Sequence, residues 1–227
     1  MTTPTRNEFM PALLAGDTFT SRSDSWLGRA IRWWQATASG ASDINHIGGV
    51  IAGGPPDMVM VAEAVGHVRN VNFWRVYANV PIRVWRNKHW TPIERAAVAR
   101  QWESAEGTGY AWLRMAPIMA DSLVGWLKRV VLRKPGEFYW FTQKLKITNF
   151  KVCSNLWAWG VEKALGTHVT GRPWQCVTPD SAEDWFRSHP DEWELVWDSV
   201  DTGAARELAA QQRMAVRLAP WRGGDVT

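Results

Sequence analysis

Four short β-prone runs follow one another between residues 46 and 86, and they restrict the fold of this part of the chain more than any other feature. The runs are 46–53, 58–65, 67–74 and 80–86. A GGPPD turn separates the first two runs, and Gly66 alone breaks the second from the third. Runs of strand length that are bounded by turn residues are typical of consecutive strands joined by hairpins. The pattern therefore predicts an antiparallel meander sheet.

Helical patterns surround this sheet segment. Thr91 is followed three residues later by Glu94, which is the signature of a capping box and predicts a helix from about 91 to 107. Other helices are expected where a cap residue precedes apolar residues at helical spacing. These helices are 24–35, 111–134, 153–166 and 178–186, with a short first strand at 16–22 and a last strand at 192–198. Strands and helices gathered in separate parts of the chain predict an α+β fold, with the meander sheet packed on helices.

The chain of 227 residues is long enough for one domain with a substantial core. We expect that domain over residues 1–198, with a helical, Trp-rich insert at about 88–148. Residues 199–227 should form a C-terminal tail helix, because 202–218 are rich in Ala, Arg and Gln.

The predicted helix 111–134 is apolar on most sides and ends in four basic residues, Lys128, Arg129, Arg133 and Lys134. A helix of this kind is either buried on several sides or presents an apolar patch to a protein partner. Contact with an anionic membrane surface is a third interpretation, because the basic end would suit lipid headgroups. All three interpretations stay open from the sequence.

The composition narrows the class of partner. The chain has 17 tryptophans, a formal net charge of +4 and a sequence pI of about 9.3. Tryptophan favours interfaces and carbohydrate-type clefts, although it also builds ordinary cores. The mild positive charge suits an anionic polymer such as a cell wall. No run of Lys and Arg is dense enough to argue for nucleic acid, so we expect no nucleic-acid partner.

Cysteine usage and the apolar runs also exclude several classes. The two cysteines do not make a disulfide framework, and no Cys/His spacing predicts a metal site or a cofactor. The N-terminus has no apolar core long enough for a signal peptide, and no segment is apolar over the length of a membrane span. We therefore expect a soluble protein that needs a carrier if it acts outside a cytoplasm.

Cys153 stands where an apolar, Trp-rich helix begins, in the stretch VCSNLWAWG. The free N–H groups and the dipole at a helix N-terminus lower the pKa of a thiol, and the same N–H groups can stabilise an oxyanion. A cysteine at a helix start is nevertheless more often a small buried hydrophobe, so both interpretations remain open on this residue alone. Cys176 lies in PWQCVTPD with no base nearby, and we expect it to be dispensable.

His46 and Glu63 are the candidates for a base and its partner. His46 opens a β-prone run between small and apolar residues, where a base could stand at the mouth of a cleft. Glu63 lies inside the apolar run VMVAEAV, and a buried carboxylate needs a partner. A carboxylate on the far ring nitrogen would orient the histidine. The alternatives are a half-buried strand histidine and an edge glutamate that points to solvent, and four other histidines compete for the role, His67, His89, His168 and His189.

The order of these motifs resembles a known family. From about residue 16 to 198 the chain carries GD, NHIGGVIAG, VAEAVGHVRNVNFW, VPIRVWR, VCSNLWAWG and VTPDSAEDWF. This order is similar to that of the permuted papain-like amidases and peptidases, the YiiX-like branch of the NlpC-type superfamily. In that family the histidine comes first, a polar residue follows on the next strand, and the cysteine lies late, at a helix start. The CSNL stretch fits this context, with Asn155 where the family commonly carries Glu.

The resemblance implies a circularly permuted papain-like (NlpC-like) fold and a catalytic triad of Cys153, His46 and Glu63. It implies a cysteine hydrolase that cleaves amide bonds, with the backbone N–H of Cys153 stabilising the oxyanion. Tyr110, before the 111–134 helix, is a further candidate hydrogen-bond donor. The resemblance favours peptide bonds of the bacterial cell wall as substrate.

Three functional interpretations follow for the whole chain. The first is a cell-wall peptidase carried by a phage tail or a similar machine, virion-associated or cytoplasmic, which acts in the host periplasm. The tail or the insert would then dock to protein partners of the tail assembly. The second is an amidase or acyltransferase on lipid substrates, and the third is a non-catalytic structural module of an assembly.

Overall fold

The fold was analysed in a computed structural model, which describes residues 11–24, 28–29, 31–32, 44–78, 80–109, 120, 124, 127, 131 and 152–199. One antiparallel sheet of six strands organises these residues, with strand order β4-β3-β2-β1-β5-β6. Its strands are β1 (Thr18–Ser21), β2 (His46–Ala52), β3 (Met60–Val65), β4 (His67–Asn72), β5 (Ile82–Asn87) and β6 (Trp193–Asp198). The α+β class predicted from the sequence is therefore correct.

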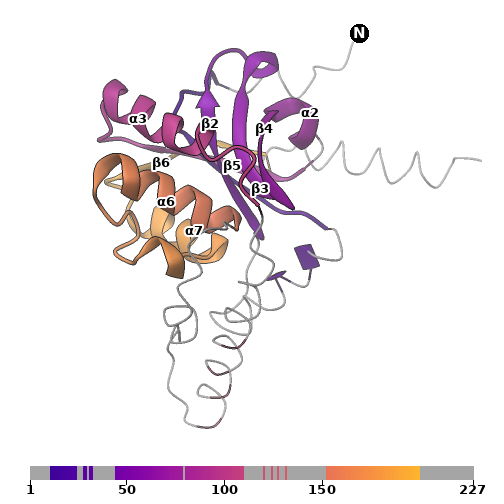
Figure 1. Ribbon diagram of the computed structural model, residues 1–227, viewed down its shortest axis with the longest axis vertical. Helices are drawn as coiled ribbons and strands as arrows, with labels where there is room; N and C mark the ends of the chain where they lie inside the picture. The colour runs from indigo at the N-terminus through magenta and orange to yellow at the C-terminus, as the bar shows by residue number, and fades with distance from the viewer. Residues whose placement is uncertain are drawn as a thin grey trace, which may run out of the picture.

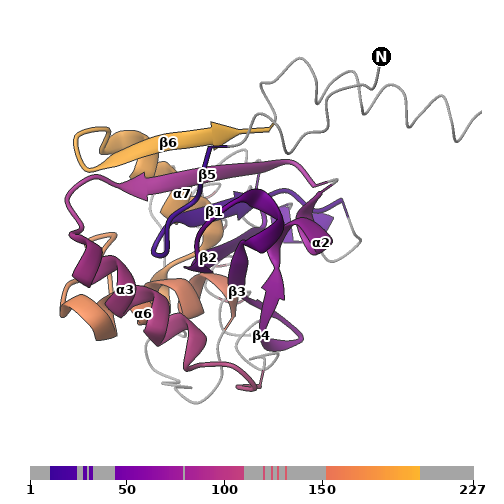
Figure 2. The same cartoon turned by 90° about the horizontal axis from the view of Figure 1, so that it is seen from above.

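The helices cover the two faces of the sheet unequally (Figures 1 and 2). The helices α3 (Pro92–Glu103), α6 (Cys153–Leu165) and α7 (Pro179–Ser188) pack on one face, and the short helix α2 (Phe73–Tyr77) lies on the other. Two short 3-10 turns complete the order, η2 (Pro56–Met58) and η3 (Trp174–Cys176). Because neighbouring strand residues point to opposite faces, each strand contributes to two cores. Ala62 and Ala64 lie in the core under α3, α6 and α7, whereas Val61 lies in the core under α2.

The predicted helix boundaries agree with local capping chemistry. The capping box of Thr91 and Glu94 is formed and starts α3 at Pro92. Thr178 and Ser181 form a second capping box at the start of α7. Gly166 ends α6 with a φ of 69°, a left-handed conformation that glycine adopts without strain. These three signals are local, and the structure confirms each of them.

The predicted meander is only partly correct. Strands β1 to β4 follow one another as neighbours, but β5 pairs with β1 instead of β4. The reason is α2, which takes the place of the end of the strand predicted over 67–74. The side chain of Asn72 accepts a hydrogen bond from the backbone N–H of Arg75 and starts a helix, so Phe73 and Trp74 are helical. The chain then returns to the far side of β1 before it enters β5 (Figure 2).

Several predicted segments lie largely or wholly outside the described residues. Of the predicted helix 24–35, the four described positions after residue 27 are helical, namely Gly28, Arg29, Ile31 and Arg32. Of the predicted helix 111–134, Ala120, Val124, Leu127 and Val131 are described and helical, and Leu127 and Val131 are exposed. The predicted tail helix lies outside the described residues, as does Tyr110. No helix within the described ranges is long and apolar enough to cross a membrane.

Two glycines bring α3 and α6 close to the sheet. A Cβ atom on Gly49 of β2 would lie 2.2 Å from the Trp102 ring, and one on Gly160 of α6 would also lie 2.2 Å from it. The Trp102 indole fills this space from α3 and donates a hydrogen bond to the backbone oxygen of Trp157, at 2.9 Å. Trp157 in turn donates to the Thr18 hydroxyl on β1, at 2.8 Å. These contacts fix the distance of α6, and so of Cys153, from the strands.

Candidate active site

Cys153 is the first residue of α6, and it is buried with 6% of its surface exposed. Val152, the N-cap residue, is extended, and its side chain makes no capping hydrogen bond to the first N–H groups of α6. The next two residues attach the helix start to the segment that leads into α7. Ser154 donates to the backbone oxygen of Val177 at 2.6 Å, and the Asn155 amide donates to that of Trp174 at 2.9 Å. Asn155 is fully buried, so its role in this structure is to hold the loop around the helix start.

His46 opens β2 and interacts with Cys153 and Glu63. Its ring atom Nε2 lies 3.3 Å from Oε2 of Glu63, within ion-pair distance although not in the geometry of a well-aligned hydrogen bond. The ring also lies close enough to the Cys153 thiol for each group to shift the pKa of the other. Because Nε2 faces Glu63, Nδ1 is the nitrogen available to that thiol. The ring packs against aromatic neighbours, with centroids 6.1 Å from Phe19 and 6.2 Å from Tyr77.

The pairing of β2 explains how His46 reaches across to Glu63. On one side His46 pairs with Ser21 of β1. On the other side, the pairs between β2 and β3 run from Ala52 and Met60 to Gly49 and Ala62, with a register shift between Val50 and Ala52. His46 therefore lies beyond the paired part of β2 and β3. Its side chain and that of Glu63 occupy the end of the sheet where these two strands are no longer paired.

Glu63 has no exposed surface, and groups from three further elements satisfy its carboxylate. Arg69 of β4 donates to Oε1 through Nε at 2.8 Å, and its Nη2 atom lies 2.6 Å from the same oxygen. The Tyr77 hydroxyl of α2 donates to Oε2. Oε2 is therefore shared between Tyr77 and His46, while Oε1 is held by Arg69. A fully buried carboxylate needs such partners, since an unpaired one would cost several kcal/mol.

The protonation states of the cluster follow from these contacts. Burial would raise the pKa of the Cys153 thiol, but the charge and close contact of His46 hold it below its usual value. The backbone N–H groups of Ile47 and Ser154 lower the pKa of that thiol further. Burial would lower the pKa of His46, but the charge of the Cys153 thiolate, followed by Glu63, raises it to about 10. The two shifts favour a thiolate–imidazolium pair at neutral pH.

Glu63 and Tyr77 are shifted in opposite directions. Burial would raise the pKa of Glu63, but the close contact and charge of His46, the Tyr77 hydroxyl and the charge of Arg69 lower it to about 2. Burial and the neighbouring Glu63 carboxylate raise the pKa of Tyr77 well above its usual value. Glu63 is therefore an anion and Tyr77 a neutral donor at any pH at which the protein would work.

The remaining candidates of the sequence analysis lie apart from this cluster. Cys176 lies in η3. It is not among the charged groups that shift the pKa of His46, which are Cys153 and Glu63. Among the competing histidines, His67 is exposed at the start of β4, and His168 pairs with Glu162 at 2.8 Å. His189 stacks on Trp185 with ring centroids 3.6 Å apart. The structure thus brings together the three residues that the sequence singled out.

Arg69 and Tyr77 were not identified from the sequence. A signal existed for Arg69, because Glu63 and Arg69 flank Gly66 at equal spacing and so face each other across the β3–β4 hairpin. Opposite charges in directly opposed positions of a hairpin attract each other. No comparable signal existed for Tyr77, since its position depends on α2, a helix that is not among those expected from the sequence.

A cavity of about 400 Å³ lies beside this cluster. His46, Glu63, Arg69 and Tyr77 form one wall of it, and the other lining residues are mainly apolar or small. They are Ser21, Ser23, Gly28, Ile31, Asn45, Ala64, Val65, Gly66, Val76 and Val80. A cavity of this size suits a small organic group with few polar contacts.

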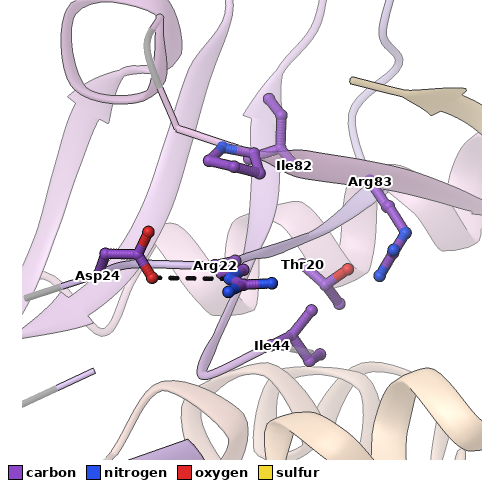
Figure 3. A pocket seen from close by; sticks show the side chains of 7 residues that line it. Thr20, Arg22, Asp24, Ile44, Ile82 and Arg83 are labelled. Carbon is purple, nitrogen blue, oxygen red and sulfur yellow. Dashed lines mark ion pairs between the residues drawn. The ribbon is translucent and has the colours of Figure 1, made fainter. Parts of the chain in front are cut away.

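A second cavity, of about 170 Å³, lies between the ends of β1 and β5 (Figure 3). Its charged groups are already paired. Arg22 lies 3.6 Å from Asp24, and Arg83 lies 2.7 Å from Glu183 and 3.0 Å from Asp198. Thr20 donates to the same Glu183 at 2.7 Å. In the parts of the chain that the structure describes, no cluster of three His, Cys, Asp or Glu side chains could hold a metal ion.

Comparison with known proteins adds a weak likeness. No protein-family model matches the chain, and no curated protein matches it. Among solved structures, it is similar to the metalloprotein yiiX from Escherichia coli O157:H7, with 19% sequence identity over 69% of this chain and 68% of that chain and a TM-score of 0.46. A likeness at this level carries no argument about function, so the assignment below rests on the geometry of the site.

Proposed function

We propose that the protein is a cysteine hydrolase that cleaves amide bonds, with Cys153 as nucleophile, His46 as general base and acid, and Glu63 as the residue that orients His46. The observation that carries this proposal is the contact of a buried cysteine at a helix N-terminus with a histidine that itself faces a buried carboxylate. A thiol in that setting is activated by an adjacent base, and the base is oriented by a third group. In chain order, His46 and Glu63 precede Cys153, which supports a circularly permuted papain-like arrangement.

The chemical steps use the groups as the site places them. The Cys153 thiolate attacks the amide carbonyl carbon, a C–S bond forms, and the carbonyl oxygen becomes an oxyanion near the first N–H groups of α6. The His46 imidazolium then gives its proton to the leaving nitrogen, the C–N bond breaks, and a thioester remains on Cys153. Neutral His46 next takes a proton from a water molecule that attacks the thioester. The acid leaves, and the thiolate and imidazolium are restored.

As substrate we propose a peptide bond of the bacterial cell wall. Two properties of the sequence support it, namely the net charge of +4 and the 17 tryptophans, which together suit an anionic polymer of glycan and peptide. Delivery by a phage tail or a similar machine, with action in a host periplasm, is part of the same proposal. Protein partners in such an assembly would bind the tail or the insert.

A second candidate is amide hydrolysis or acyl transfer on lipid substrates. The observation that favours it is the cavity beside His46, whose lining includes Ile31, Ala64, Val65, Val76 and Val80. Such a wall suits an apolar group better than a sugar. A non-catalytic module of an assembly is the third interpretation, and it requires that Cys153 be unreactive.

Mass spectrometry of purified sacculi after incubation with wild type and with Cys153→Ala tests the first candidate. New peptide fragments that appear with wild type alone would support a wall peptidase. The same pair of proteins is then incubated with phospholipid and N-acyl lipid vesicles, where released fatty acid or transferred acyl groups would support the second candidate. If neither substrate changes and iodoacetamide labels Cys153 no faster than an ordinary thiol, the hydrolase assignment is wrong.

A further inference from the structure

The Glu63 carboxylate is held from the side opposite His46 by a second cation. Arg69 makes two contacts with Oε1, at 2.8 Å through Nε and at 2.6 Å through Nη2. Both contacts go to one oxygen, so the guanidinium fixes the position of Oε1. Tyr77 adds a donor on Oε2, the oxygen that faces His46. The carboxylate therefore has little freedom to rotate away from the imidazole.

Arg69 is also the more exposed of the two side chains. Its side chain is 36% exposed, whereas the side chain of Glu63 is fully buried, and both residues line the cavity of about 400 Å³. Without the guanidinium, Oε1 would be a buried acceptor next to a space that water can enter. An unpaired buried carboxylate oxygen is costly, and the group would be expected to rotate or to take up a proton.

The charged and titratable groups around Glu63 come from four elements. They are the His46 imidazolium on β2, Arg69 on β4, the neutral Tyr77 hydroxyl on α2 and, behind His46, the Cys153 thiolate on α6. Two positive and two negative groups then share one buried site. If Arg69 is removed, the site carries one excess negative charge beside a thiolate, which makes the thiolate harder to form.

We infer that Arg69 is a positioning residue of the active site, which keeps Glu63 ionised and aligned so that the Cys153–His46 ion pair persists into the acidic range. This inference rests on the proposed function, in which Cys153 is the nucleophile. Tyr77 assists through the second oxygen, but it carries no charge. Arg69 is therefore the residue whose loss should change the pH dependence of the thiol.

The test measures the rate of alkylation of Cys153 by iodoacetamide as a function of pH, in full-length protein that carries Cys176→Ala. No knowledge of the substrate is needed. The variants are Arg69→Met, which removes charge and donors, Arg69→Gln, which keeps one donor, and Arg69→Lys, which keeps the charge. Arg75→Met is the matched control, because Arg75 is an exposed cation on α2, two residues from Tyr77. Thermal melting of each variant shows whether it is folded.

In wild type and in Arg75→Met, the acid limb of the alkylation profile should lie well below that of a free thiol. In Arg69→Met and Arg69→Gln it should move up by about one pH unit, which makes alkylation about ten-fold slower at pH values well below the wild-type midpoint. In Arg69→Lys, which keeps the charge, the acid limb should move up by less than half as much. If Arg69→Met does not fold, Arg69→Gln decides, because its amide can still bond Oε1.

The outcomes separate the two claims. An ordinary thiol profile in wild type would overturn the proposed function, and this inference with it. A low-pH profile in wild type that is unchanged in Arg69→Met and Arg69→Gln would overturn only the role of Arg69. A shift of equal size in the Lys and Met variants, together with equal losses of melting temperature, would assign Arg69 a purely structural role.

Discussion

His46 and Glu63 face each other at 3.3 Å between Nε2 and Oε2, although the strands that carry them are no longer paired at that point. The last pair between β2 and β3 is Gly49 with Ala62, so the contact is made beyond the end of this ladder. The histidine ring also lies beside Cys153, the first residue of α6.

Replacement of Cys153 by Ser should abolish hydrolysis without unfolding the protein. The hydroxyl is nearly isosteric with the thiol, but it is far harder to ionise. The rate should fall by at least about 1,000-fold, as expected when one member of a catalytic unit is removed. Hydrolysis of sacculi measures the rate, and thermal melting checks the fold. Cys176→Ser is the matched control, since Cys176 is also buried, and it should retain near wild-type activity. Loss of activity in Cys176→Ser alone would place the nucleophile elsewhere.

Glu63→Gln should reduce activity less than His46→Ala. The histidine moves the proton, a contribution of about 100- to 10,000-fold. The Glu63→Gln side chain still accepts a hydrogen bond through its amide oxygen, but it loses the charge and one of the two acceptor oxygens. Steady-state rates of both variants decide the order. His67→Ala and Glu103→Gln serve as controls because both side chains are exposed. An activity of His46→Ala equal to that of wild type would exclude His46 as the base.

The stability of the protein should depend on pH in an acidic range, through Glu63, and in an alkaline range, through His46. Glu63 has a pKa lowered from 4.5 to about 2, so its contribution is present above pH 4.5 and is lost as the pH falls toward 2. His46 has a pKa raised from 6.5 to about 10, so its contribution is complete below pH 6.5 and is lost as the pH rises through 10. Melting temperature measured across the pH range should fall at both ends. Glu63→Gln should flatten the acid side, and an unchanged acid side in that variant would contradict this account.

Gly160→Ala should destabilise the protein by about 1 to 3 kcal/mol through overpacking. The new methyl group would lie 2.2 Å from the Trp102 ring, which α3 places between α6 and β2. Urea unfolding measures the loss. Trp102→Leu removes the ring that is in the way, so the added cost of Gly160→Ala should be smaller in that background than in wild type. Equal costs in both backgrounds would show that Trp102 does not limit the approach of α6.

Local signals in the sequence were sufficient for several elements of the fold. The capping boxes before α3 and α7, and Gly166 after α6, act within a few residues of the chain, so their effect does not depend on distant contacts. The placement of Cys153 at a helix start belongs to the same class. His46 and Glu63 were identified from their positions in β-prone runs, and the family resemblance of the motif order connected them with Cys153.

Contacts between distant residues decided the rest. Strand periodicity is the same for any choice of neighbour, so it could not show that β5 pairs with β1, which follows from the turn of the chain through α2. Tyr77 reaches Glu63 only because of that helix, and Arg69 reaches it because β4 folds back on β3. The sequence by itself determined which groups could carry the chemistry. The tertiary structure decided which charges surround Glu63, because the charge balance of a buried site depends on which elements pack together.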